Sequence, residues 1–321
     1  MKFLVIGGSG FVGANLVRRL VTDRHEVVVM DSLDPHLHST TEHLKPVWNE
    51  IEFVRGDMRD ESALARCVQG QDVIVNCAAQ TSHPLSIQFP LLDAEINCLG
   101  NLKLLETVRL VNKSARVVYT SSSTVIGKAI NEVVDEDHGE RPLDIYSANK
   151  GVAEKYYRIY HTVHDLQTSV VRFGNLFGPY GKGYSVFGFV NYFISLAWSN
   201  QPITVYGTGS QMRNVTFIDD AVDAILLAAT EPKMIGECCF ATSENHRSVG
   251  EIAHAIVDVL GRGRVEHIDW PEERKRMEIE NVRFSSARFA GLTGWRARHT
   301  LESGLEATRR ALESSGELVT V

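Results

Sequence analysis

The sequence has no long apolar run and no excess of positive charge. No stretch of its 321 residues is apolar over the length that a membrane-spanning helix needs. Met1 and Lys2 lead directly into a strand-like run without a cleavage site, so we expect a cytoplasmic protein. The formal net charge of −7 gives no general attraction to nucleic acid or to an anionic membrane, and neither is expected as a partner. A phosphate-bearing ligand would have to be held at a discrete site.

Cysteine is also scarce. The five cysteines form no Cys-x-x-Cys pair, and no cysteine or histidine cluster has zinc-finger spacing, so we expect reduced thiols and no metal site. The sequence contains neither an internal repeat nor a low-complexity linker. Its length allows one large domain, or two domains that share a cleft.

Up to about residue 170, short β-branched apolar runs alternate with segments of helical length. This alternation is typical of βαβ units that build a parallel sheet, whose buried strands are apolar almost throughout. The expected strands are Phe3–Gly7, Glu26–Met30, Ile51–Arg55, Asp72–Asn76, Arg116–Thr120 and Ser169–Phe173. The expected helices lie near 11–22, 61–68, 92–111 and 146–164.

Beyond Arg172 the alternation gives way to a glycine-rich stretch, an expected helix near 187–200 and a turn at 207–209. Such irregularity is typical of a substrate domain built onto a regular cofactor domain. A helix near 219–230 and a strand near 236–241 should return to the first domain, and further helices are expected near 248–260 and 300–313. We predict a doubly wound parallel α/β domain from 1–173 plus 214–241, and a smaller mixed α/β C-terminal domain from 174–213 plus 242–321.

A glycine-rich loop joins the first strand to the first helix. Gly7, Gly10 and Gly13 permit a tight turn and a close backbone approach, so that a pyrophosphate can lie on the helix N-terminus. The second strand ends in Asp31, whose carboxylate can accept hydrogen bonds from an unmodified ribose, which favours NAD over its 2′-phosphorylated form. The predicted cofactor contacts of this region are Gly7, Gly10, Phe11, Val12, Gly13, Asp31 and Ser32.

The ends of two further strands should face the same cofactor site. Asp57 and Met58 follow the third strand, and Asp57 could accept a hydrogen bond from the adenine amino group. Ala78 and Ala79 follow the fourth strand, where small side chains let the backbone approach the cofactor. Open α/β sheets bind ligands beyond the carboxyl ends of their strands, which is where these four residues would lie.

Tyr146 and Lys150 are four residues apart and therefore share one face of a helix. A neighbouring cation favours the phenolate, so we expect Lys150 to lower the pKa of Tyr146 and let it take a proton from a sugar hydroxyl. The fifth strand ends in a hydroxyl-rich run, 120–124, that can place a hydrogen-bonding group beside the phenol. By itself, such a run is equally consistent with a polar turn.

Together these motifs resemble the NAD-dependent epimerase/dehydratase family of extended short-chain dehydrogenases/reductases. The resemblance rests on the glycine-rich loop, the Thr-Ser-Ser-Ser strand end, the Tyr-Ser-Ala-Asn-Lys motif and the segments 172–179 and 209–220, which occur in family order over nearly the whole chain. The most similar pattern is that of UDP-glucose 4-epimerase-like enzymes, including those that act on UDP-glucuronate. The resemblance implies a Rossmann-type sheet, bound NAD and a nucleotide-sugar substrate, with a UDP-sugar favoured.

The family pattern also implies roles for individual residues. Ser122 would be the catalytic hydroxyl that partners Tyr146, and Lys150 would tune the phenol and hold the nicotinamide ribose. Asn97 would contact the cofactor near its ribose. The implied substrate contacts are Ser82, Ser86, Ser122, Ser123, Asn175, Arg213 and Arg274. Of these, Arg213 and Arg274 would hold the diphosphate, because guanidinium groups suit phosphate oxygens, although Lys275 or Arg276 could equally take the place of Arg274.

The resemblance implies a reaction that begins with oxidation of a sugar carbon, usually C4. Related 4,6-dehydratases carry an Asp-Glu pair where this chain has Ser123 and Thr124, so epimerisation through a 4-keto sugar is the expected outcome. A 4-keto-sugar reductase and a 4,6-dehydratase remain alternatives, as does a non-catalytic dinucleotide-sensing protein on the same fold. The helices near 92–111 and 146–164 would form a homodimer, as they do in the family.

Three positions depart from the family pattern: Ile126 replaces a tyrosine, Asn214 an acidic residue and Ser285 an aspartate. We expect them near or behind the sugar-nucleotide pocket, where they would alter the choice of sugar or base. His83 could contact the sugar, although a histidine before proline is also typical of a structural loop.

Overall fold

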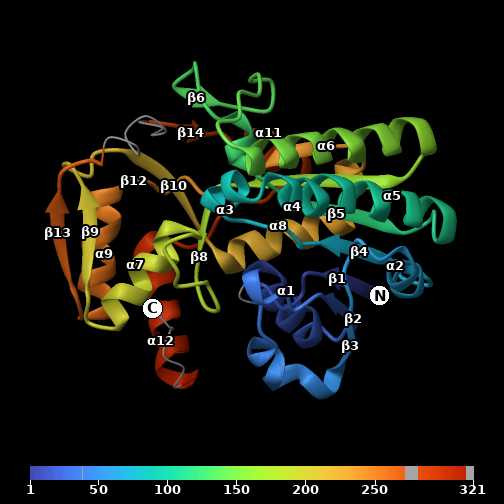
Figure 1. Cartoon of the computed structure of the whole chain (residues 1–321), viewed down its shortest axis with the longest axis horizontal. Coiled ribbons are helices and arrows are strands. Elements are labelled where there is room, and N and C mark those ends of the chain that lie inside the picture. The colour runs from blue at the N-terminus through green and yellow to red at the C-terminus, as the bar shows by residue number, and fades with distance from the viewer. Residues whose placement is uncertain (38, 272–280, 316–321) are drawn as a thin grey trace.

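The computed structural model describes residues 1–37, 39–271 and 281–315. Its centre is a seven-stranded sheet of order β11-β7-β5-β4-β1-β2-β3, and every neighbouring pair in it is parallel. This is the doubly wound Rossmann-type sheet that the alternating pattern predicts (Figure 1). Its strands are β1 Lys2–Ile6, β2 Glu26–Asp31, β3 Ile51–Arg55, β4 Val73–Asn76, β5 Arg116–Ser122, β7 Gln167–Phe173 and β11 Cys238–Phe240.

Alternate residues of each strand enter two separate cores, one on each face of the sheet. In β1, Phe3 and Val5 belong to one cluster of buried residues and Leu4 and Ile6 belong to the other. Both faces must therefore be covered, which explains why the strands are apolar throughout. The helices that cover them are α1 Phe11–Thr22 and α8 Ile218–Thr230 on one face, and α2 Glu61–Val68, α5 Gly100–Val111 and α6 Ile145–His164 on the other.

Several short elements lie near the carboxyl ends of the strands of the central sheet. The expected helix near 92–111 begins earlier, as α4 Pro90–Ala94, and contains a π-helical turn, η3 Glu95–Leu99, before α5. A short helix that the sequence did not predict, α3 His83–Gln88, precedes it. The remaining short elements on this side are η1 Pro35–Leu37, η4 Ser123–Ile126 and β6 Val133–Val134. η2 Glu42–Glu50 leads into the start of β3, and η5 Pro232–Met234 lies at the opposite edge of the sheet, near the starts of β5 and β7.

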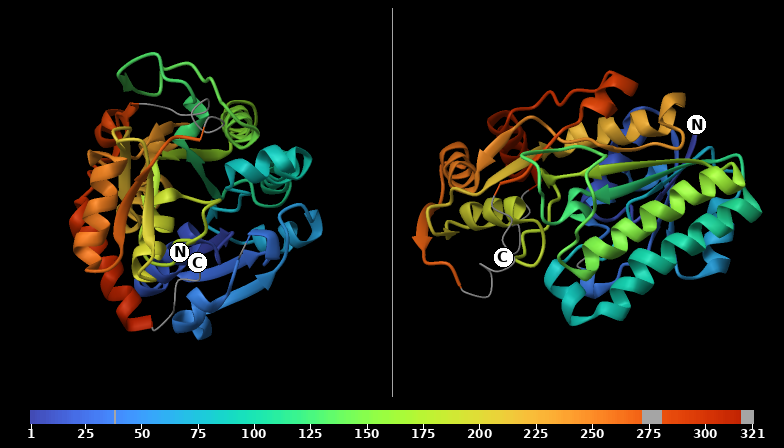
Figure 2. Two further views of the ribbon diagram at one scale, coloured as in Figure 1. Left: turned by 60° about the vertical axis from the view of Figure 1, so that its left-hand side comes forward. Right: turned by 90° about the horizontal axis from the view of Figure 1, so that it is seen from above.

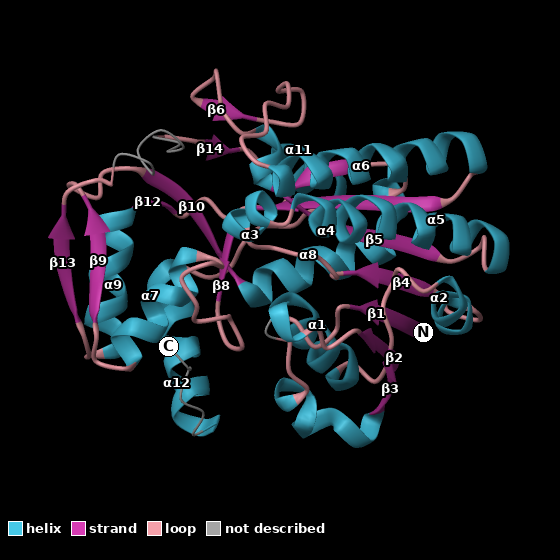
Figure 3. Cartoon of the chain, viewed as in Figure 1, coloured by secondary structure: helices cyan, strands magenta, loops and turns pink. Residues whose placement is uncertain are grey.

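The C-terminal part combines helices with three small sheets (Figures 2 and 3). β10 Met212–Phe217 lies between β8 Asn175–Phe177, which is parallel to it, and β12 His246–Ser248, which is antiparallel. β9 Pro202–Tyr206 pairs with β13 Arg264–Ile268, and β14 Arg283–Phe284 pairs with β6. The helices are α7 Phe189–Trp198, α9 Val249–Leu260, α11 Ala287–Thr293 and α12 Leu301–Ser315.

This mixture of short strands and helices agrees with the smaller α/β part that the sequence predicts, although most of its strands were not predicted individually. The division of the chain into two domains stays a prediction. No helix among the described residues combines the length and the apolar character that crossing a bilayer requires.

Candidate active site

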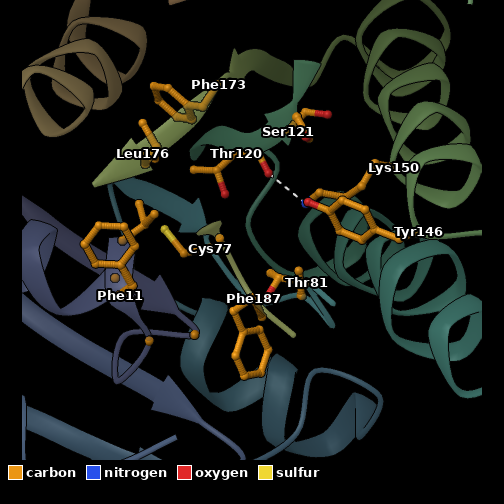
Figure 4. A pocket seen from close by; sticks show the side chains of 18 of the residues that line it. Phe11, Cys77, Thr81, Thr120, Ser121, Tyr146, Lys150, Phe173, Leu176 and Phe187 are labelled. Carbon is orange, nitrogen blue, oxygen red and sulfur yellow. Dashed lines mark hydrogen bonds between the residues drawn. The ribbon is translucent and has the colours of Figure 1, made fainter. Parts of the chain in front are cut away.

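The carboxyl ends of β1 to β5 open onto a cavity of about 520 Å³. Its opposite wall comes from the stretch that follows β7, together with Arg213 of β10 and the pair Val282 and Phe284. Figure 4 shows the apolar and hydroxyl-bearing side chains that surround this space, with Tyr146 and Lys150 at one side and Phe11 at another. The cavity therefore lies where open α/β sheets bind ligands.

The glycine-rich loop is shaped for close approach of a ligand to the backbone. Gly7 has a φ of +75°, and a Cβ atom there would lie 2.6 Å from the backbone of Ala78. A Cβ atom on Gly13 would lie 2.2 Å from the carbonyl oxygen of Gly7. Gly10 is the N-cap of α1 and no side chain caps that helix, so the amide groups of its first turn face the cavity without a side-chain competitor. This cradle fits a pyrophosphate.

Asp31 provides the second element of a dinucleotide site. Its two carboxylate oxygens each accept one backbone hydrogen bond, from Ser9 N and from Leu33 N, both at 2.9 Å. Burial raises the pKa of Asp31, while these hydrogen bonds and the charge of Lys182 oppose the rise. Each oxygen keeps a lone pair for a ribose hydroxyl. A second negative charge at this buried position would be repelled, so the residues fit NAD rather than its 2′-phosphate.

The other residues predicted from the strand ends also line the cavity. Ser32, Met58, Ala78 and Ala79 all form part of its wall. Asp57 does so too, but its carboxylate is engaged by Arg59, which donates from its backbone N at 2.8 Å, from Nε at 2.9 Å and from Nη2 at 2.7 Å. A contact between Asp57 and adenine stays a prediction and would have to use the remaining lone pairs of the carboxylate.

Lys150 is buried at the base of the cavity and connects α6 to β5. Its Nζ donates a hydrogen bond of 2.8 Å to the carbonyl oxygen of Thr120, drawn as the dashed line in Figure 4, and lies 4.4 Å from the centre of the Tyr119 ring. Burial disfavours the ammonium form and lowers the pKa of Lys150 to about 8, although nearby acidic groups oppose this shift. The ammonium is thus held in a fixed position by a strand end.

Tyr146 behaves differently from the sequence-based prediction. Its side chain is buried in the cavity wall, and this burial raises its pKa above the usual value, with a hydrogen bond to Ser122 only partly opposing the rise. The predicted lowering of the pKa by Lys150 is therefore wrong for the chain by itself, because Lys150 is directed to Thr120 and desolvation outweighs the other contributions. NAD⁺, when bound, would supply the hydride acceptor, and the positive charge of its nicotinamide would favour the phenolate form of a tyrosine beside it.

Ser122 is brought to Tyr146 as predicted, and it also bonds to its own strand end. Its Oγ lies 2.8 Å from Oγ1 of Thr124 and accepts a weaker hydrogen bond of 3.2 Å from Thr124 N. Ser122, Ser123 and Thr124 all line the cavity. The three residues predicted to act in catalysis, Ser122, Tyr146 and Lys150, therefore share one wall of the same space.

Three predicted contacts lie behind this wall. Ser82 caps α3, Ser86 donates from Oγ to the carbonyl oxygen of His83 at 2.8 Å, and Asn97 donates to the carbonyl oxygen of Gln80 at 2.8 Å. All three side chains are fully buried and do not line the cavity. The structure thus gives Ser82 and Ser86 a role in shaping the loop rather than in reaching the sugar. The Oδ1 atom of Asn97 is buried without a hydrogen-bond partner among the described residues.

The predicted diphosphate end is partly present in the described structure. Asn175 and Arg213 both line the cavity, where Asn175 donates to Asn214 O at 3.1 Å and Arg213 Nη1 donates to Met212 O at 2.8 Å. Arg274 lies outside the described residues. The roles of Asn175 and Arg213 in binding a sugar nucleotide stay predictions.

The three departures from the family pattern occupy supporting positions and do not line the cavity. Ile126 is fully buried in a small apolar core with Phe240. Asn214 joins two elements, donating to Ser243 O at 2.9 Å and accepting from Phe284 N at 3.0 Å. Ser285 accepts a hydrogen bond of 3.3 Å from the backbone N of Ala287. Any effect on the substrate would have to act through the residues in front of them.

Sequence reasoning missed a segment that crosses the cofactor end of the cavity. Residues 178–187, which we call the strap, dock onto the N-terminal part of the chain. The carbonyl oxygen of Pro179 accepts a hydrogen bond of 3.0 Å from Asn15 in α1. Tyr180, whose φ is +65°, lies with its ring centre 5.1 Å from the Arg18 guanidinium and 4.9 Å from the His43 ring.

Lys182 extends from the strap into the same region. Its Nζ donates a hydrogen bond to Leu37 O, and it lies 4.5 Å from the centre of the Phe187 ring and within Coulombic range of Asp31. Burial lowers the pKa of Lys182 to about 8, while Asp31 opposes the shift. The sequence shows only that Lys182 lies in a glycine-rich stretch. This does not indicate that Lys182 would contact the loop after β2.

A dinucleotide cradle beside a buried tyrosine and lysine defines the short-chain dehydrogenase class of enzyme, and comparison with known proteins agrees. Residues 3–237 match the model of the NAD dependent epimerase/dehydratase family, so the chain belongs to this family. The chain is 30% identical over 316 residues to UDP-glucose 4-epimerase of Mycolicibacterium smegmatis, with 96% of this chain and 97% of the relative covered. It is 27% identical to dTDP-glucose 4,6-dehydratase of Xanthomonas campestris pv. campestris, with 95% and 91% covered.

Among solved structures, UDP-glucose 4-epimerase of Thermus thermophilus in complex with NAD superposes with a TM-score of 0.85 at 25% identity, with 98% of this chain and 99% of the other covered. The protein is thus an NAD-dependent member of the nucleotide-sugar epimerases and dehydratases.

We expect Lys182→Met to release the cofactor more readily than the unaltered protein does. The substitution removes a cation next to the ribose site and a hydrogen bond that holds the strap, so release of NAD should be about 10-fold faster. Because the charged form is lost above about pH 8, retention in the unaltered protein should also weaken as the pH rises through that value. To check both effects, free NAD is removed by gel filtration and samples are taken over time. The NAD still bound to the protein in each sample is then released by denaturation and measured.

Lys113→Met, at an exposed position, is the matched control for this prediction. Equal cofactor retention by Lys182→Met and Lys113→Met would contradict a role for the strap.

Proposed function

We propose that the protein epimerises C4 of a nucleotide-diphosphate hexose or hexuronate, with a UDP-sugar favoured, through a transient 4-keto intermediate. Tyr146 takes the proton of the sugar hydroxyl, and Ser122 hydrogen-bonds at that oxygen. NAD⁺ held by the glycine-rich loop and Asp31 would accept the hydride from the same carbon. The ketone then turns over and receives the hydride on its opposite face, while Tyr146 returns the proton. The cofactor is restored in each cycle.

The proposal rests on the positions of the acidic residues in the cavity, which lie at its cofactor end and not beside Tyr146. The carboxylates among its described lining residues are Asp31, Asp34 and Asp57, which lie at or just after the ends of β2 and β3, at the cofactor end. Around Ser122 and Tyr146 the wall instead presents the imidazole of His83 and several hydroxyl groups, including that of Thr124, which is bonded to Ser122. Loss of water from a 4-keto sugar needs an acid and a base beside the sugar, and hydroxyl groups do not replace carboxylates in these roles.

The alternatives make different use of the same three residues. A 4-keto-sugar reductase would consume one NADH in each turnover, and a 4,6-dehydratase would release a deoxy-keto sugar. A non-catalytic dinucleotide-sensing protein would need no combination of a hydroxyl, a phenol and a lysine at the nicotinamide end. The convergence of Ser122, Tyr146 and Lys150 on one wall therefore favours an enzyme.

Incubation with a panel of nucleotide sugars tests the reaction directly. The panel contains UDP-glucose, UDP-galactose, UDP-glucuronate and their N-acetyl relatives, without added cofactor. We expect interconversion of one pair, with the product configuration read by NMR. A requirement for stoichiometric NADH would favour the reductase, and a deoxy-keto product would favour the dehydratase.

We expect Tyr146→Phe to lower turnover by a factor of about 10² to 10⁴ while NAD stays bound. The ring and its packing are retained and only the proton-transferring hydroxyl is lost. Tyr160→Phe is the matched control, because Tyr160 lies in the same helix and its hydroxyl bonds to Glu106 away from the cavity. Turnover and bound NAD are measured on the same preparations, and undiminished turnover in Tyr146→Phe would contradict the mechanism.

We further propose that the protein forms a homodimer through α4, α5 and α6 and acts in the cytoplasm. α6 packs against both α4 and α5, and the helices lie side by side in the different views of Figures 1 and 2. Large apolar side chains are exposed on them, which is typical of a surface that a second subunit covers. They are Leu91, Leu110, Val111, Ile145, Ile159 and Val163, together with Leu99 of η3 between α4 and α5.

We expect Val163→Glu to weaken the dimer, because it would bury a charge in an apolar interface. Ile130→Glu is the matched control, since Ile130 is similarly exposed but lies outside these helices. The mass in solution, measured by light scattering over a range of concentrations, should fall toward that of a monomer only for Val163→Glu. A monomeric unaltered protein would refute the proposed dimer.

A further inference from the structure

A histidine and an aspartate form a pair beside the catalytic tyrosine. His83 Nδ1 lies 2.5 Å from Oδ2 of Asp144, and its ring packs edge-on against that of Tyr146, with centres 4.9 Å apart and planes at 77°. Asp144 is the N-cap of α6, and its other oxygen accepts a hydrogen bond of 2.8 Å from Ser147 N. The carboxylate that starts the catalytic helix thus also holds the imidazole.

The backbone of His83 is fixed from the opposite side. Ser86 Oγ donates to the carbonyl oxygen of His83, as described above. Gln80 Nε2 donates to Ser82 O and to the buried Asp93, both at 2.8 Å, which anchors the start of the loop. Both the main chain and one ring nitrogen of His83 therefore have defined positions, so the other ring nitrogen is also well placed.

The pair is neither part of a buried core nor a simple surface ion pair. The side chain of His83 is 45% exposed and lines the cavity, whereas that of Asp144 is only 16% exposed. Burial raises the pKa of Asp144, but its interactions with His83 and Ser147 more than offset this and keep the pKa low. The carboxylate accepts the Nδ1 hydrogen, and in the neutral tautomer that this bond selects the second ring nitrogen, Nε2, is the acceptor. No hydrogen bond joins Nε2 to another described residue.

We propose that His83 is a specificity-determining residue that accepts, through Nε2, a hydrogen bond from a hexose hydroxyl next to the one that Tyr146 deprotonates. Asp144 is its positioning residue. The inference rests on the proposed function and names a sugar contact for the same site. Neighbouring hydroxyls of a hexose are about a hydrogen bond apart, so a sugar oxygen at Tyr146 brings the next one toward a ring in edge contact with the phenol.

Two substitutions at His83 separate its two ring nitrogens. Asparagine in His83→Asn can still bond to Asp144 in the place of Nδ1 but has no atom at the place of Nε2. Glutamine in His83→Gln can supply an acceptor near Nε2. We expect His83→Asn to raise the KM for the nucleotide sugar about 10-fold with a smaller change in kcat, and His83→Gln to recover most of the loss. His254→Asn, an exposed position on α9, is the control.

Asp144→Asn tests the positioning role without removing the helix cap, since asparagine caps helices as well as aspartate does. Its amide would donate to Nδ1 and shift the hydrogen to Nε2, which would turn the acceptor into a donor. We expect the same rise in KM as for His83→Asn. Melting temperature and bound NAD, measured for each variant, should match the unaltered protein, and if His83→Asn does not fold then Asp144→Asn provides the same comparison.

UDP and UDP-glucose are the probes for binding. Calorimetry should give an unchanged affinity for UDP in His83→Asn and a weaker affinity for UDP-glucose, because only the latter carries the hexose. A KM within twofold of the unaltered enzyme in both His83→Asn and Asp144→Asn, or an equal loss for UDP and UDP-glucose, overturns the proposal for His83. Absence of any turnover by the unaltered protein overturns the proposed function instead, so the two failures are distinguishable.

Discussion

The hydrogen bond from Lys150 Nζ to the carbonyl oxygen of Thr120 is the contact on which the rest of the site depends. It joins the helix that carries Tyr146 to the strand end that carries Ser122, and it is made by a buried cation whose pKa burial lowers to about 8. A buried ammonium needs such a partner, since an unpaired charge at this depth would strongly destabilise the fold. The requirement to pair Lys150 therefore also sets the distance between α6 and β5 near the reacting atoms.

The parallel sheet makes this convergence possible. All seven strands run in one direction, so the residues that follow β1, β2, β3, β4 and β5 meet at one edge and form one wall of the cavity. The opposite wall comes from the chain after β7, and the strap brings part of it back onto α1 and the loop after β2. The cofactor end of the cavity is thus enclosed by segments far apart in the sequence. A catalyst that restores its cofactor in each cycle would benefit from such an enclosure.

The features predicted correctly from sequence depend on local pattern, and the errors arise where burial or distant segments decide the outcome. The strands of the central sheet lie within about two residues of their predicted ends, because continuous apolar runs between turns leave few alternatives. The spacing of Tyr146 and Lys150 places them on one helix face, but it does not reveal how deeply the phenol is buried, and burial reverses the predicted pKa shift. His83 and Asp144 are 61 residues apart, so their pairing leaves no local signal. Ser82 was predicted to contact the substrate, but its side chain caps α3 instead. The sequence of a loop does not show which of its polar side chains hydrogen-bond to the loop's own backbone.

Charge is distributed unevenly along the cavity, and this distribution connects the fold to the proposed chemistry. The carboxylates of the described wall lie at or after the ends of β2 and β3, where ribose hydroxyls would need acceptors, and hydroxyl groups lie at the end of β5, where the sugar would react. Asp144, which lies close to Tyr146, is turned away into its bonds with Ser147 and His83 and does not line the cavity. A 4-keto sugar at this end would meet the phenol of Tyr146, several weakly acidic hydroxyls and the imidazole of His83, but no carboxylate of the described wall. Return of the hydride is then the outcome that the surrounding groups favour over removal of a carbon-bound proton.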